Sequence, residues 1–201
     1  SDMQADIAAQ LVRAGVEVHV FNQRSIARIL AMIETLGGLI GEPGKAAALV
    51  DDLERNVAAL RRRGAELPRR PRVYFEEWND PLICGIHWVS ELIEIAGGED
   101  VFGERSRQGL ARQRIIADPL EVVRRAPELI IGSWCGKKFQ PASVVDRPGW
   151  DAIPAVRCRR LHEIKSCDIL QPGPAALTDG LARLHTLIAA TAADDSADRQ
   201  R

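Results

Sequence analysis

Short apolar segments with strand composition alternate with segments of helical periodicity after Pro71, and this alternation constrains the fold more than any other feature of the sequence. Leu129–Gly132 is an apolar run of the kind found in strands buried on both faces of a sheet. Strands separated by helices are joined by right-handed crossovers, which places them parallel and covers both faces with helices. The predicted fold class is therefore α/β, with a mostly parallel sheet and flanking helices. The pattern predicts strands at Arg72–Glu76, Arg114–Ile116, Leu129–Gly132 and Leu161–Ile164, and helices at Leu82–Ala96, Asp118–Arg125, Ala142–Val145 and Pro174–Ala192.

A long amphipathic helix precedes this α/β region. Apolar residues recur at helical spacing between Lys45 and Leu67, and a Pro-Arg-Arg-Pro sequence ends the pattern. Further upstream, the alternating segment Val16–Phe21 predicts a strand, and Ser25 is placed to cap the helix that follows it. The predicted organisation is an N-terminal part over residues 1–41, a bridging helix over residues 42–67, an α/β lobe over residues 68–192, called the second lobe below, and a disordered polar tail over residues 193–201.

Charge and composition exclude several classes of function. The 27 basic and 28 acidic residues leave a net charge of -1, which gives no overall field for nucleic acid or for an acidic lipid surface. The longest apolar runs fall far short of the roughly 20 residues that span a bilayer. The four cysteines form no Cys-x-x-Cys pair and are too few for a disulfide scaffold. The chain begins at Ser1 inside a helical pattern and without a signal peptide, so we interpret it as cut from a longer protein.

Three loops follow the strands of the predicted sheet and mark the expected binding site. Ligands of parallel sheets bind beyond the C-terminal ends of the strands, which here means loops Glu77–Pro81, Ser133–Lys138 and Lys165–Pro172. The first two loops carry Trp78 and Trp134, whose flat apolar faces suit a large planar ligand. A loop tryptophan that packs on its own domain is the alternative for each ring. Of the other two tryptophans, Trp150 is expected in the core and Trp88 is left undecided.

Two other kinds of site are less well supported by the residues. Cys135, His162 and Asp168 include a thiol and a proton acceptor, so a cysteine-dependent hydrolase is the alternative from a different class of function. No known catalytic motif surrounds Cys135, and a single strand histidine is usually structural. Cys158 and His162 supply only two zinc ligands, without a second pair at finger spacing. Gly132–Lys137 lacks the spacing of a phosphate-binding loop.

Longer segments of the second lobe resemble one family closely. Arg72–Pro81 followed by Trp88–Phe102 is similar to the start of the second lobe in cobalamin-binding proteins, including its Gly-Gly-Glu-Asp-x-Phe turn. Ile131–Lys138, Arg147–Trp150 and Leu170–Pro174 resemble a bacterial subgroup of cobalamin-binding or iron-chelate-binding proteins. Together with the long bridging helix, these segments resemble the helical-backbone class of periplasmic substrate-binding proteins of ABC importers.

This resemblance implies a binding protein and not an enzyme. By this resemblance, the protein is expected to capture cobalamin or a related metal chelate, to deliver the chelate to a membrane permease, and to work in the periplasm or at the cell surface. Neither a catalytic residue nor a resident metal or cofactor is implied, and residues 1–41 correspond to the remnant of a first lobe. A cytoplasmic protein that senses or stores corrinoids is a further alternative, and the resemblance does not choose among corrinoid, heme and siderophore.

The resemblance and the loop positions together select the site residues. Both tryptophan rings are expected to be partly exposed and to open on the same cleft. An acidic pair, Asp146 and Asp151, is predicted to dock on the permease. The predicted ligand-binding residues are Glu77, Trp78, Asp80, Ser133, Trp134, Cys135, Gly136, Lys137, Asp168 and Gln171.

Overall fold

Five strands of the computed structural model form one mixed sheet; the structure describes the backbone of residues 2–198 and the side chains of residues 5–194. β1 (Arg72–Asn79), β4 (Leu129–Gly132) and β5 (Leu161–Glu163) are parallel neighbours. β2 (Leu82–Cys84) runs antiparallel to the end of β1, whereas β3 (Glu99–Asp100) pairs parallel with the first two residues of β1. The order is β2-β1-β4-β5, with β3 also on β1. The mostly parallel α/β fold predicted from the alternation is confirmed.

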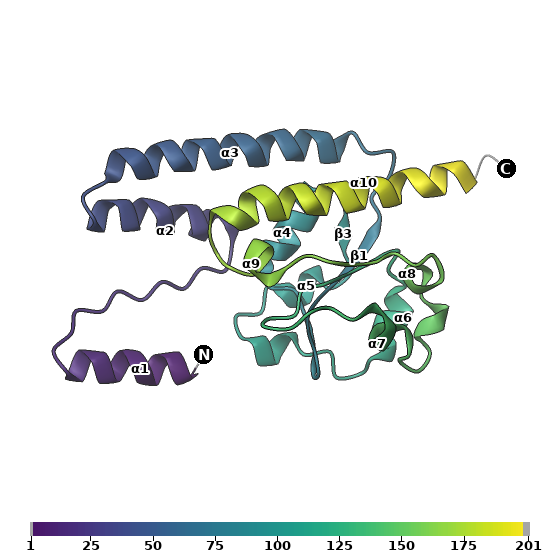
Figure 1. Ribbon diagram of the computed structural model, residues 1–201, viewed down its shortest axis with the longest axis horizontal. Helices are drawn as coiled ribbons and strands as arrows, with labels where there is room; N and C mark the ends of the chain where they lie inside the picture. Colours follow the sequence, from purple (N-terminus) through teal and green to yellow (C-terminus); the bar gives the residue numbers. More distant parts are fainter. Residues whose placement is uncertain (1, 199–201) are drawn as a thin grey trace.

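Side chains of the sheet alternate between two hydrophobic cores, one on each face. Val73 and Phe75 enter the first core, whereas Tyr74 between them enters the second, as the two-residue period of a strand requires. Figure 1 shows α3, α4 and α10 above the sheet and α6 and α7 below it. The first core includes residues of α2 (Ile26–Leu39), α3 (Pro43–Ala65), α4 (His87–Ile95), α9 (Ser166–Ile169) and α10 (Leu181–Asp198), and the second includes residues of α6 (Leu120–Arg125), α7 (Pro141–Val145), α8 (Pro154–Arg157) and the 3-10 helix η2 (Trp150–Ala152).

The long helix predicted upstream of the sheet is α3, and it connects the N-terminal part of the chain to the second lobe. Its C-terminal end crosses close to the end of α4. A Cβ atom at Gly64 would lie 2.4 Å from the carbonyl oxygen of Ile95, so this crossing requires glycine. At the start of α2, the backbone N–H of Ile26 donates to the Glu91 carboxylate of α4 at 2.8 Å. Both helices of the α2–α3 hairpin are therefore attached to α4, at the open end of the hairpin.

Among the described side chains, α1 (Asp2–Arg13) and the extended segment after it contribute none to either core. In Figure 1, α1 lies apart from the sheet at the end of this segment. Three of its large apolar side chains are exposed: Ile7 by 51%, Leu11 by 41% and Val12 by 61%. The strand predicted over Val16–Phe21 is wrong, because no described strand lies beside this segment to bond its backbone groups. That residues 1–41 are the remnant of a lobe stays a prediction.

Three other predicted elements differ from the structure. The helix predicted to start at Leu82 starts at His87, because the chain turns at Asp80-Pro81 and residues 82–84 pair with β1 as β2. The strand predicted at Arg114–Ile116 is a single bridge from Ile115 to Ile83 after the 3-10 helix η1 (Ala111–Arg114). The closing helix starts at Pro174, as predicted, but residues Ala176–Gly180 form a π-helical turn before α10.

The C-terminal helix extends beyond the end that the sequence pattern predicts. α10 continues to Asp198, through most of the segment predicted to be a disordered tail, and residues 199–201 lie outside the described part of the chain. Within that described part, no helix combines the length and apolar character needed to cross a membrane.

Candidate functional site

A mainly apolar cavity of about 270 Å³ opens at the C-terminal end of the sheet. Four of the predicted ligand-binding residues come together in it from three parts of the chain: Glu77 and Trp78 lie in the last residues of β1 and not on the loop predicted after it, Cys135 follows β4, and Gln171 follows α9. That this cavity binds a ligand stays a prediction. Its remaining walls are Ile83, Ile86, Trp88 and Leu170.

Trp78 is the half-buried aromatic ring of this cavity, and its orientation is fixed from two sides. Its indole N–H donates to the backbone oxygen of Asp80 at 2.8 Å, across the turn of the β1–β2 hairpin. The ammonium group of Lys137 lies 4.4 Å from the centre of the Trp78 ring, a cation-π contact. A hydrogen bond and a cation therefore hold the ring at the wall of the cavity.

The carboxylate of Glu77 is bound to a buried arginine. Arg114 donates to both Glu77 oxygens at 2.6 and 2.9 Å and also to the backbone oxygen of Cys84. The Arg114 side chain is 3% exposed and that of Glu77 is 21% exposed, so the pair is largely removed from water. Glu77 reaches the cavity as one member of a neutral ion pair and not as an isolated charge.

Trp134 belongs to the core, contrary to the expectation of a partly exposed ring. Only 4% of it is exposed, its indole N–H donates to the Glu76 carboxylate at 3.0 Å, and it stacks edge-on against Phe139. The neighbouring Ser133 is fully buried. A Cβ at Gly132 would lie 1.9 Å from the Phe139 ring, so glycine makes room for this packing. The hydrogen bond to Glu76 and the packing on Phe139 therefore distinguish Trp134 from the half-buried Trp78.

Glu76 is a fully buried hub that the sequence prediction did not select. Its carboxylate accepts two hydrogen bonds from Arg147, at 2.6 and 2.9 Å, besides those of Trp134 and of the Tyr74 hydroxyl at 3.2 Å. Burial, with the adjacent Glu76 charge as a second cause, raises the pKa of Tyr74 well above its usual value. The hub ties the β4 loop to Arg147, which follows α7.

A second cavity, of about 440 Å³, lies on the other side of the β4 loop. Trp134, Gly136 and Lys137 line it together with residues after β5. The prediction that both tryptophans open on one cleft is therefore wrong: Trp78 lines the first cavity and Trp134 lines the second. Lys137 links them, since its ammonium group is 4.4 Å from the centre of the Trp78 ring and 5.1 Å from that of Trp134.

The remaining predicted residues lie outside the first cavity. Asp80 is exposed and lines a separate depression beside Arg147. The carboxylate of Asp168 accepts a hydrogen bond from the Cys167 thiol at 3.2 Å, and this bond raises the pKa of the thiol. Asp168 itself lines neither cavity. Asp146 and Asp151 are both exposed and flank the α7–η2 turn.

The structure does not assemble the alternative hydrolase site. Cys135 is exposed on the loop after β4, whereas His162 lies within β5 beside Ile131. No hydrogen bond joins them in the described structure, and burial followed by the Arg183 charge lowers the pKa of His162. No group of three metal-ligating side chains is found among the described residues either.

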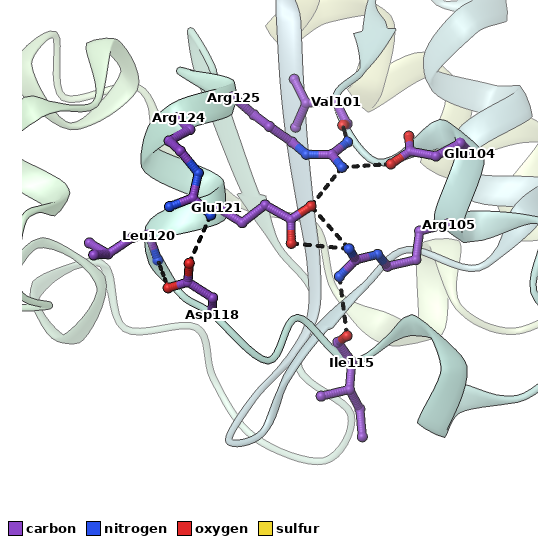
Figure 2. Close-up of polar contacts among 9 residues, drawn as sticks. All are labelled: Val101, Glu104, Arg105, Ile115, Asp118, Leu120, Glu121, Arg124 and Arg125. Atoms are coloured by element: carbon purple, nitrogen blue, oxygen red, sulfur yellow. Dashed lines mark hydrogen bonds and ion pairs between the residues drawn. The ribbon is translucent and has the colours of Figure 1, made fainter.

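An ion-pair network supports the wall of the first cavity from behind. Arg105 donates to both oxygens of Glu121 at 3.0 Å and to the backbone oxygen of Ile115 at 3.2 Å (Figure 2). Ile115 bridges to Ile83, which lines the cavity, and follows Arg114, which binds Glu77. Arg125 extends the network to Glu104, and this contact lowers the pKa of Glu104. The network thus holds the segment after α5 (Gly103–Ser106) against the hairpin.

Sequence reasoning missed several apolar walls of the first cavity. Trp88, left undecided, is buried with its indole N–H on the Ile169 oxygen at 3.0 Å, and it lines the cavity from α4. Ile83 was assigned to a helix because the hairpin at Asp80-Pro81 went unrecognised. That dipeptide between two apolar segments was the signal that marks such a turn. Trp150 is fully buried in the second core, as predicted.

Comparison with known proteins decides the family. A family model described as periplasmic binding protein matches residues 1–167 of the chain. The chain belongs to the periplasmic binding protein family. No curated protein sequence matches it. The family assignment agrees with the resemblance found in the sequence.

Solved structures of this family share its fold. A possible iron-binding, periplasmic solute-binding protein from Staphylococcus epidermidis aligns over 92% of this chain and 70% of its own, with 20% identity and a TM-score of 0.74. The periplasmic heme-binding protein RhuT from Roseiflexus sp. RS-1 aligns over 92% of this chain and 71% of its own, with 22% identity and a TM-score of 0.77. The periplasmic vitamin B12 binding protein BtuF of Vibrio cholerae aligns over 91% of this chain and 69% of its own, with 18% identity and a TM-score of 0.68. These identities establish a common fold and leave the ligand open.

Proposed function

We propose that this periplasmic binding protein is the substrate-binding component of an ABC importer, that it captures cobalamin or a related metal chelate, and that it works in the periplasm or at the cell surface. The observation that carries the proposal is the first cavity, where Trp78 offers a fixed, half-buried ring among apolar walls. Proteins with a similar fold include one named as heme-binding and one named as vitamin B12 binding. Both ligands are broad chelates with an apolar face and polar edges.

The size and polarity of the cavity fit the edge of such a ligand. Its volume of about 270 Å³ is at or below the lower end of the roughly 300–1,000 Å³ typical of small-molecule sites, so a chelate would extend beyond it. Glu77 contributes no net charge because Arg114 neutralises it. Gln171 and Cys135 add polar atoms at the wall. The chelate would therefore rest one edge against Trp78 and present its other face to an opposing surface, which in this proposal is the remainder of a first lobe.

Titration with chelates tests the proposal. Quenching of tryptophan fluorescence is measured with cobalamin, hemin and a ferric hydroxamate siderophore. We expect one of them to bind, and Trp78→Ala to weaken its binding by roughly tenfold to a hundredfold, or about 1 to 3 kcal/mol. Trp78→Phe is the matched control, because it keeps a flat apolar ring and should retain most of the affinity. Absence of binding by all three chelates, or equal affinity in Trp78→Ala, would contradict the proposal.

Handover to the permease is proposed to use Asp146 and Asp151. Both are exposed beside Arg147, whose side chain is tied to Glu76 and thereby to the loop after β4. An exposed acidic pair attracts a basic surface, and this attraction weakens with salt. Reversing both charges to lysine should slow chelate uptake at low salt while leaving chelate affinity intact. Reversal of the exposed Asp52 on α3 is the control; unchanged uptake in the double reversal would remove the assignment.

A further inference from the structure

The second cavity collects most of the lysines of the protein. The sequence contains 27 basic residues, and only four of them are lysines: Lys45, Lys137, Lys138 and Lys165. The last three line the second cavity, from the loops after β4 and β5. Lys45 is on α3 and pairs with Glu42 at 2.9 Å. Lysine, a flexible point charge that binds carboxylate and phosphate, is thus concentrated at one position of the fold.

These three ammonium groups are not neutralised within the cavity. All three lysines are exposed, and among the described residues none of them forms an ion pair with a carboxylate. The acidic residue of the cavity lining is Glu163, and one of its oxygens already accepts the backbone N–H of Phe139 at 2.9 Å. Three positive charges against one carboxylate give the cavity a positive local potential, which attracts an anionic group.

Lys137 places this positive cavity directly beside the apolar one. Its ammonium group contacts the ring of Trp78, which lines the first cavity, and the ring of Trp134, which lines the second. The two cavities are therefore separated by little more than the side chain of Lys137 and the loop that carries it. A single ligand that rests on Trp78 can extend an arm past Lys137 toward Lys138 and Lys165.

We propose that the second cavity is an anion subsite for a carboxylate or phosphate arm of the chelate held against Trp78. This inference rests on the proposed function and adds to it a ligand class: an amphipathic chelate with an apolar body and at least one acidic arm. The subsite selects among chelates by charge, because a neutral chelate of the same shape leaves three ammonium groups without a partner.

Two pairs of probes separate the body of a ligand from its acidic arm. Hemin and its dimethyl ester differ in the two carboxylates, and cobalamin and cobinamide differ in the nucleotide arm that carries a phosphate. Affinities are measured for the chain and for Lys138→Gln combined with Lys165→Gln. The double variant should bind the acidic member of the pair about three- to tenfold more weakly, as expected for exposed ion pairs, and the neutral member within twofold. Lys45→Gln is the matched control and should change neither affinity.

Lysine-selective acetylation followed by peptide mass spectrometry locates the arm directly. The acidic chelate should slow modification of Lys138 and Lys165 several-fold, and Lys45 should react at the same rate throughout. Inorganic phosphate alone, at the chelate's concentration, should protect none of them; equal protection by phosphate would indicate a free-anion site and overturn the proposed arm. Binding of a chelate with no difference between acidic and neutral forms, or with no effect of the double variant, would overturn the subsite and leave the proposed function standing. If none of the four probes binds, the subsite fails; the proposed function fails with it if the ferric hydroxamate siderophore does not bind either.

Discussion

Residues 2–24 and the second lobe carry the same two sequence patterns but differ in what those patterns produce. Each contains an amphipathic helix and an alternating apolar segment. In the second lobe, β1 has parallel neighbours and α4 buries its apolar side chains in the first core. In residues 2–24, α1 leaves Leu11 and Val12 exposed, and Val16–Phe21 pairs with no described strand. Periodicity thus indicates which face is apolar, while a partner decides whether that face is buried.

The same leucine truncation should therefore have very different effects in the two regions. Leu92 of α4 is fully buried and Leu11 of α1 is 41% exposed. Leu92→Ala should lower the free energy of unfolding by about 3 kcal/mol, because it opens a cavity in the first core, and Leu11→Ala by less than about 0.5 kcal/mol. Urea denaturation followed by circular dichroism measures both. Comparable losses would show that α1 is packed as firmly as α4.

Removing the charge of one glutamate in each region should also affect stability differently. Glu76 is fully buried in its pair with Arg147, whereas Glu17 is an exposed residue of the extended segment. Glu76→Gln should cost about 2 to 3 kcal/mol of stability, because it leaves the guanidinium of a largely buried arginine without a counter-charge. Glu17→Gln should change stability by less than about 0.5 kcal/mol in the same urea experiment. A neutral result at Glu76 would mean that water or another acid replaces its carboxylate.

Glycine substitutions test how tightly each region is packed. A methyl group at Gly132 would meet the Phe139 ring at 1.9 Å, whereas one at Gly38 of α2 would have no heavy atom within 4 Å. Gly132→Ala should lower stability by about 2 kcal/mol through overpacking. Gly38→Ala should raise it by about 0.5 to 1 kcal/mol, since alanine favours the helix. Melting temperatures of the two variants should therefore shift in opposite directions; a shift in the same direction would contradict the packing around Phe139.

Substitution of Asp100 should change the free energy of unfolding less than the losses predicted at Leu92, Glu76 and Gly132, and the change should depend on pH. Burial raises the pKa of Asp100 to about 6 from the usual 3.8, and its Oδ2 is buried without a hydrogen-bond partner. Because the folded-state pKa is above the unfolded one, this group's contribution to stability is fully present below about pH 4 and is lost as the pH rises through 6. Asp100→Asn should therefore stabilise the protein by about 1 to 2 kcal/mol at pH 7 and by much less at pH 4.

Glu99→Gln is the matched control for this pH effect, because Glu99 is the exposed neighbour on β3. The difference in unfolding free energy between each variant and the parent is followed from pH 4 to pH 8 by urea titration. A gain for Asp100→Asn that does not grow with pH would show that its carboxyl is solvated in the folded protein.

Strand and helix patterns within the second lobe were sufficient to predict its fold, while the details at the strand ends were not. β4 is four residues of unbroken apolar sequence, and the alternation of strands and helices predicted that the main strands run parallel. The hairpin after β1 was missed because Leu82 and Ile83 fit a helical stripe equally well, and only the turn at Asp80-Pro81 distinguishes the two. The strand predicted at Val16–Phe21 fails because pairing is a long-range property that a local pattern does not contain.

The sequence predicted which segments meet at the end of the sheet better than it predicted the direction of their side chains. The last residues of β1 and the segments after β4 and α9 contribute to the first cavity, and four of the ten predicted ligand-binding residues line it. Trp134 comes two residues after β4, whereas Trp78 lies within the last residues of β1, and the indole N–H of Trp134 turns inward to Glu76, a buried acid that no local pattern distinguishes from its neighbour Glu77. Burial of a polar group is decided by its partners, here Arg147 and Tyr74, which lie far away in the sequence or on the same strand.

Thiol protection tests most directly whether the first cavity is the ligand site. Cys135 is exposed and lines that cavity, whereas Cys158 is exposed between α8 and β5, at the opposite end of β5 from the cavity. The rate of alkylation of each thiol is measured by peptide mass spectrometry with and without the chelate that quenches tryptophan fluorescence. The proposed site predicts that the chelate slows modification of Cys135 at least tenfold and leaves Cys158 unchanged. Equal rates at Cys135 with and without a bound chelate would place the ligand elsewhere and contradict the account.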